Sequence, residues 1–155
     1  MIVVLDTGPL GRISNPRASD LNLACYQWLE SLLKQDIPVF IPEIADYEVR
    51  RELLRARKLP GLARLDLLKD TLEYLPLTTP IMLRAAELWA QARQQGYPTA
   101  DPQALDGDVI LAAQALTLHG IVATDNVGHL ARFVDARPWQ EISTTLPPES
   151  PEGSQ

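Results

Sequence analysis

Short apolar runs alternate along the chain with longer segments of helical periodicity, and this order constrains the fold more than any single motif. The expected strands lie at 2–5, 37–41, 74–77 and 121–124, with a last one between 133 and 142. The expected helices lie at 20–35, from about 43 to 58, from 79 to 95 and from 106 to 118. A further helix is expected after the break at Pro60-Gly61 and ends at about residue 71. This alternation predicts an α/β fold in three layers (α/β/α), with a central parallel sheet of four to five strands.

The chain of 155 residues has the length of one domain. We expect that domain to span residues 1–143. The remaining segment, 144–155, is rich in Pro, Ser, Glu and Gly and lacks core-forming residues, so we expect a disordered tail there. Segments 6–9 and 97–104 contain Gly or Pro and are expected to be loops.

Composition limits the setting and the chemistry. No apolar run reaches the roughly 18 residues that cross a membrane, and the N-terminus lacks the basic start of a signal peptide. Cys25 is the only cysteine, so a cytoplasmic location is expected, and a zinc cluster is disfavoured by this cysteine count and by only two histidines. The net charge of −6 counts against a nucleic-acid partner, because phosphates favour basic surfaces. An acidic metal site would explain part of that charge.

Several acids fall where parallel strands end or helices begin. Asp6 follows the first strand, Asp125 follows the strand that ends at Thr124, and Asp106 and Asp108 open a helix. Ligands of open parallel sheets bind beyond the carboxyl ends of the strands, so these acids can meet at one edge. Each also has a structural interpretation. Asp6 could bond the amides after its strand, Asp106 could be an N-cap, and Asp125 could be a turn residue.

The helix from about 43 supplies a further acid. On a helical wheel that starts at Ile44, Glu48 falls near 40° and Glu52 near 80°, beside the apolar arc, at about 100° per residue. A carboxylate at the core boundary is costly unless it is paired or bound to a metal. Glu48 is therefore a candidate site residue, Glu52 is its rival, and a salt bridge to a neighbouring Arg is the structural alternative.

Several carboxylates in a small space repel one another, and a divalent cation removes this conflict. Mg²⁺ and Mn²⁺ prefer oxygen ligands, and metal-assisted hydrolysis of phosphodiesters suits a site without His or Cys. We expect Asp6 and Asp108 to bind the metal. Glu48 would bind a metal or polarise the attacking water, and Asp125 would support a second ion or that water.

Basic residues follow Glu48 along the same helix. Arg50, Arg51, Arg55, Arg57 and Lys58 form either a solvated face with Glu partners or a strip that contacts phosphates beside the acidic site.

Four segments together resemble the PIN-domain family, particularly the VapC-like toxins of bacterial toxin–antitoxin pairs. They are Val3-Val4-Leu5-Asp6-Thr7, the stretch 47–53 around Glu48, the stretch 108–113 that starts at Asp108, and the stretch 122–130 around Asp125. The resemblance covers about residues 1–135 and favours Asp108 over Asp106 as the third acid. The fourth segment departs from the family pattern: Asp125 comes one residue early, and Asn126 stands where many members have an acid.

The resemblance implies a PIN fold, Mg²⁺ or Mn²⁺ as cofactor, endoribonuclease activity, an antitoxin protein as partner and frequent homodimers. A different class is a PIN-type nucleic-acid-binding module with little or no cleavage activity, which the altered fourth segment keeps open. A phosphatase of the haloacid-dehalogenase type normally shows Asp-x-Asp, whereas Asp6 is followed by Thr7-Gly8. A phospho-receiver domain lacks support because no Lys follows a late strand.

Overall fold

The computed structural model describes residues 1–96 and 102–142 and shows five strands and six helices in these ranges. In chain order they are β1 (Val3–Leu5), α1 (Thr7–Ser14), α2 (Asp20–Lys34), β2 (Val39–Pro42), α3 (Glu43–Arg55), α4 (Leu59–Thr71), β3 (Glu73–Leu75), α5 (Thr79–Gln94), α6 (Pro102–Leu118), β4 (Ile121–Thr124) and β5 (Ala136–Pro138). Two short 3-10 turns follow β4 and β5, at Leu130–Arg132 and Trp139–Glu141. None of the described helices is both long and apolar enough to span a bilayer.

The strands form one parallel sheet in the order β3-β2-β1-β4-β5, which confirms the predicted fold class. β1 lies at the centre, with Val3 beside Val39 of β2 and Ile121 of β4. The chain crosses from one half of the sheet to the other between β3 and β4. In such sheets the carboxyl ends of the central strands are the usual place for a site.

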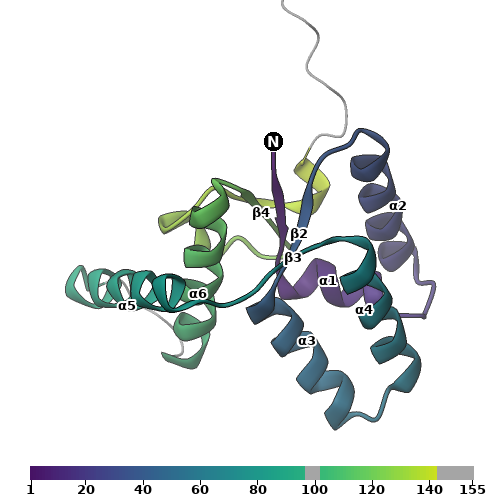
Figure 1. Cartoon of the computed structure of the whole chain (residues 1–155), viewed down its shortest axis with the longest axis horizontal. Coiled ribbons are helices and arrows are strands. Elements are labelled where there is room, and N and C mark those ends of the chain that lie inside the picture. Colours follow the sequence, from purple (N-terminus) through teal and green to yellow (C-terminus); the bar gives the residue numbers. More distant parts are fainter. Residues whose placement is uncertain (97–101, 143–155) are drawn as a thin grey trace, which may run out of the picture.

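The two faces of the sheet are covered by different helices (Figure 1). Side chains alternate along a strand, so Val3 and Leu5 face one layer and Val4 faces the other. Val3 and Leu5 belong to the main core, which includes residues of α1, α2, α3 and α4. Val4 packs with Leu111 and Ala115 of α6. Helix α5 packs on α6 through a separate apolar cluster.

Two expectations about the helices were wrong. The loop expected at 6–9 is instead the N-cap and first turn of α1 (Thr7–Ser14), because Pro9 lies in that turn, where its missing N–H is not needed. Helix α6 begins at Pro102, for the same reason, and not at Asp106. Asp106 is therefore not an N-cap. Residues 97–101 of the expected loop, and the expected disordered tail at 144–155, lie outside the described residues.

A buried glutamine joins the sheet to α6. Gln114 is fully buried, accepts the backbone N–H of Ile44 at the start of α3, and donates to the carbonyl of Leu75 in β3. A buried amide with both ends bonded fixes its neighbours in one arrangement. The start of α3 and the middle of α6 are therefore held at a defined separation, and both helices line the site described next.

Candidate functional site

Asp6 lies at the carboxyl end of β1 and is held by two hydrogen bonds. The backbone N–H of Thr7 donates to Oδ1 at 2.7 Å, and the Thr124 hydroxyl donates to Oδ2 at 2.7 Å. Asp6 thus caps α1 and bonds an amide after its strand, which was its alternative, structural interpretation. It also lines a cavity. Burial raises the pKa of Asp6, although the bonds from Thr124 and Thr7 oppose that rise.

Glu48 reaches the same place from α3. The Thr7 hydroxyl donates to its Oε2 at 3.2 Å, so one residue of α1 contacts both acids. Burial raises the pKa of Glu48, and the charge of Asp6 adds to the rise. The rival Glu52 is exposed and pairs with Arg55 instead. No ion pair of Glu48 with an arginine is found within the described ranges.

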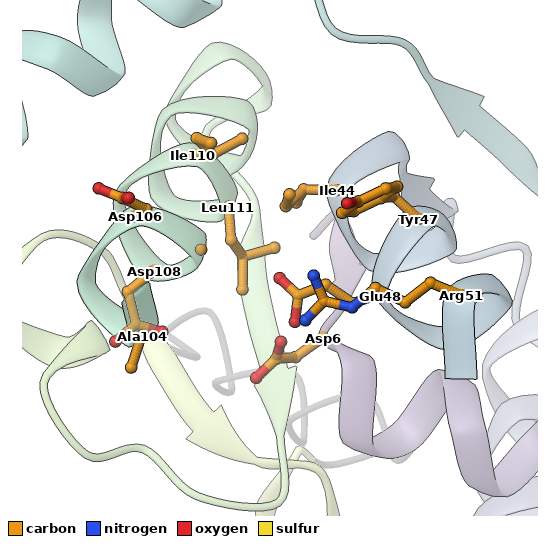
Figure 2. A pocket seen from close by; sticks show the side chains of 11 residues that line it. Asp6, Ile44, Tyr47, Glu48, Arg51, Ala104, Asp106, Asp108, Ile110 and Leu111 are labelled. Atoms are coloured by element: carbon orange, nitrogen blue, oxygen red, sulfur yellow. The ribbon is translucent and has the colours of Figure 1, made fainter. Parts of the chain in front are cut away.

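Asp108 completes the group from the opposite side, on α6 (Figure 2). Its pKa is raised to about 6, mainly by burial and then by the negative charges of Asp6 and Glu48. Gly107 lets this helix come close, since a Cβ there would lie 2.9 Å from Oε1 of Glu48. A side chain at 107 would displace Glu48, so a glycine inside a helix is explained here by the approach of the two acidic elements.

These acids surround one open cavity of about 620 Å³. Its lining residues are Asp6, Ile44, Tyr47, Glu48, Arg51, Ala104, Asp106, Gly107, Asp108, Ile110 and Leu111. Figure 2 shows Asp6 and Glu48 next to each other, with the Arg51 side chain reaching toward Glu48. Asp106 is exposed and lies at the edge of this cavity.

Asp125 does not line this cavity. It forms an ion pair with Arg12 of α1 at 3.1 Å and accepts a hydrogen bond from the Trp139 indole at 2.9 Å. Gly8 permits this position, because a Cβ there would lie 2.5 Å from an Asp125 oxygen. The catalytic role expected for Asp125 stays a prediction. The negative charge of Asp125 adds to the raised pKa of Asp6.

Thr124 links the fourth sequence segment to Asp6. This buried hydroxyl donates to Asp6 and accepts the backbone N–H of Asn126 at 3.1 Å. Sequence reasoning gave no role to Thr124, Thr7 or Gly107. In the sequence Thr7 directly follows Asp6 and Thr124 directly precedes Asp125, and this adjacency could have indicated that both threonines contact the acids. The close approach of Gly107 needed the packed structure.

The basic residues of α3 divide into two groups. Arg50 pairs with Asp46 and Asp66, and Arg55 pairs with Glu52, as on a solvated face. Arg51 instead lines the cavity, and its charge opposes the rise in the pKa of Glu48 that burial causes. Of the five basic residues that were expected to contact phosphates, Arg51 is the one that lines this cavity.

The donor set fits a hard divalent cation. Asp6, Glu48 and Asp108 all line the cavity, and each of these three has a pKa raised by burial and by the charge of another acid. Oxygen-only donors of this kind suit Mg²⁺ or Mn²⁺. Within the described residues, no group of three or more His, Cys, Asp or Glu side chains is arranged so that it could already hold a metal ion. The acids are gathered around the cavity without forming a finished coordination shell.

Comparison with known proteins supports the fold. The family model described as PIN domain matches residues 3–133. Among curated proteins no match is found. The similar solved structures include VapBC2 from Rickettsia felis bound to a promoter DNA fragment, FitAcB from Neisseria gonorrhoeae and VapBC-1 from nontypeable Haemophilus influenzae.

The likeness extends over nearly whole chains. The first of these structures has a TM-score of 0.72 at 20% identity and covers 90% of this chain and 99% of its own. The second has a TM-score of 0.65 at 21% identity, with 91% and 100% covered. The third has a TM-score of 0.66 at 18% identity, also with 91% and 100% covered. At these identities the likeness establishes a shared fold.

Proposed function

The chain belongs to the PIN-domain family, and on that premise we propose that it is a metal-dependent endoribonuclease that hydrolyses RNA phosphodiester bonds. The observation that carries the proposal is the meeting of Asp6, Glu48 and Asp108 around one cavity. They come from β1, α3 and α6, and within the described residues no cation forms an ion pair with any of them.

The residues of the chain have distinct parts in this proposal. Asp6 and Asp108 would hold Mg²⁺ or Mn²⁺, which when bound supplies an activated water and shields phosphate charge. Thr124 and the Thr7 amide orient Asp6, and the Thr7 hydroxyl orients Glu48. Glu48, whose pKa is raised, would bind a metal or polarise the attacking water from its side of the cavity.

Cleavage of RNA by the pure protein tests the proposal. We expect a labelled single-stranded RNA to be cut with Mn²⁺ and left intact with a chelator. Asp6→Asn should abolish cutting, since the variant keeps an N-cap but loses the charge. Asp66→Asn changes an exposed acid remote from the cavity and serves as the control. Equal cutting by wild type and Asp6→Asn would refute the assignment.

A second candidate is a PIN-type nucleic-acid-binding module with little or no cleavage activity. The observation that favours it is the position of Asp125, which is engaged by Arg12 and Trp139 and does not line the cavity. RNA binding without cutting in the same assay, across Mg²⁺ and Mn²⁺, would select this candidate.

We further propose that the chain is the toxin of a type II toxin–antitoxin pair in the cytoplasm, and that it forms a homodimer. The support is the fold shared with VapBC2 and FitAcB. A short neighbouring reading frame for a DNA-binding protein, and rescue of growth when both are expressed together, would support the toxin role. Growth unaffected by expression of this chain alone would contradict it. Light scattering of the purified protein tests the dimer.

A further inference from the structure

Tyr47 and Arg51 form a pair at the rim of the acidic cavity. They lie one helical turn apart on α3, on either side of Glu48 in the sequence, and both line the cavity. The guanidinium carbon of Arg51 lies 5.1 Å from the centroid of the Tyr47 ring. Figure 2 shows the Arg51 side chain next to Glu48 and the Tyr47 side chain beside Ile44, so the pair lies on the α3 side of the cavity.

The Tyr47 ring is open to a second partner. The residue is 57% exposed, and Arg51 lies over its ring. Within the described residues its hydroxyl has no hydrogen bond, whereas the Tyr74 hydroxyl donates to Asp46 at 2.9 Å. Tyr47 therefore leaves a large aromatic surface in solvent directly beside the acids, where packing of the protein itself does not need it.

Arg51 differs from the other arginines of α3. Arg50 and Arg55 are neutralised by acids of their own helix or of α4. Arg51 makes no ion pair among the described residues and keeps its guanidinium on the cavity side. A planar cation with five donors suits a phosphate, and it stacks equally well on an aromatic ring.

We propose that Tyr47 and Arg51 clamp the nucleotide next to the bond that is cut: the Tyr47 ring stacks on its base, and Arg51 binds its phosphate. The inference rests on the proposed function and gives it a substrate class, single-stranded RNA with an unstacked base. A duplex keeps its bases stacked on each other, so it cannot offer a base to the ring. Stacking on an aromatic side chain accepts any base, which predicts weak sequence preference at this nucleotide.

Binding of a fluorescein-labelled single-stranded 12-nucleotide RNA in Mn²⁺, followed by anisotropy, tests the clamp. The full chain carries Asp6→Asn in every sample so that the RNA stays intact. Tyr47→Ala should weaken binding roughly 5- to 150-fold, the range found when stacking aromatics are removed. Tyr47→Phe should bind as the parent does, because the ring is kept. Tyr26→Ala is the matched control, since Tyr26 is exposed on α2 away from the acids.

Two further arms separate stacking from general attraction. An RNA duplex of the same sequence should bind equally to the parent and to Tyr47→Ala. Arg51→Gln should weaken single-strand binding and reduce its salt dependence by about one phosphate contact. Unchanged binding of the single strand by Tyr47→Ala, an equal loss for the duplex, or no binding by the parent would each overturn the clamp.

Cleavage by protein with Asp6 intact separates this inference from the proposed function. If the wild type binds RNA but never cuts it, the endoribonuclease proposal fails, and the Tyr47→Ala comparison still decides the clamp. If the wild type cuts, Tyr47→Ala should raise KM with a smaller change in kcat. Cutting with KM and kcat both unchanged would overturn the clamp alone.

Discussion

Helix α3 carries two acidic regions on different faces, and their surroundings are opposite in kind. Asp46 is 5% exposed, bonds to Arg50 and to the Tyr74 hydroxyl, and has Lys69 at 3.6 Å. Glu48, two residues later and so about 200° around the helix, faces Asp6 and Asp108. The first region matches its negative charge with cations of the chain. The second collects negative charges around a cavity.

This difference separates a structural acid from a functional candidate. A buried carboxylate is tolerated when it is paired and bonded, as Asp46 is. Asp6 and Glu48 receive hydrogen bonds from neutral groups, and the pKa values of Asp6, Glu48 and Asp108 are all raised. Unmatched acids held together by the fold are costly, so a cation from solution is the partner that would complete them.

The largest contrast is expected in activity. Asp108→Asn should lower kcat/KM for RNA cleavage by at least about 100-fold, because one charge of the metal-binding group is lost. Asp46→Asn should stay within about threefold of the wild type, because Asp46 does not line the cavity. Steady-state kinetics with Mn²⁺ measures both. A similar loss in the two variants would remove the distinction between the regions.

Stability should respond in the opposite sense. Asp46→Asn should lower the free energy of unfolding by about 2 kcal/mol, since Arg50 and Lys69 lose a buried counter-charge. Asp66→Asn, at the exposed end of the Arg50 pair, should cost less than about 0.5 kcal/mol. Urea denaturation measures both values. Equal values would mean that burial of Asp46 contributes nothing.

The pH dependence of stability should sharpen the same contrast. The pKa of Asp108 is raised from 3.8 to about 6 in the folded chain, so folding favours its protonated form. Its charge therefore destabilises metal-free protein above pH 6, and this penalty fades as pH falls from 6 toward 4. At pH 7.5, Asp108→Asn should stabilise the metal-free chain by about 1 kcal/mol, because water screens a half-buried carboxylate.

Thermal unfolding in a chelator at pH 7.5 and pH 4.5 measures this gain. It should shrink at the lower pH, and Mn²⁺ at pH 7.5 should raise the Tm of the wild type more than that of Asp108→Asn. A gain equal at both pH values would show that the charge of Asp108 is not the cause.

The smallest effect is expected at Asp125. Asp125→Asn should lower kcat/KM by no more than about threefold and the free energy of unfolding by about 1 kcal/mol, because the half-exposed pair with Arg12 is weakened. The kinetic and urea measurements are those used above. A loss of activity as large as that of Asp6→Asn would instead place Asp125 in the catalytic group.

The strands and most helices could be predicted from the sequence, because the spacing of their apolar residues matches the faces that are buried in the fold. Sequence reasoning missed α1, where Gly8 and Pro9 indicate a loop until Asp6 is seen to cap the first turn. It started α6 late, because Asp106-Gly107 resembles a helix start, while the residue that begins the helix is Pro102. Glycine and proline depend strongly on context, since each suits both turns and particular helix positions.

For the site, the sequence by itself determined which acids can meet. The strand-end position of Asp6, the wheel position of Glu48 and the helix that carries Asp108 all follow from local periodicity and the order of a parallel sheet. Only the tertiary structure decided which acids remain without a cation. Arg12 and Trp139 engage Asp125, and Arg50 and Lys69 engage Asp46, across separations in the chain that no local pattern encodes. Charge pairing depends on distances in space, and those distances are set when the helices pack on the sheet.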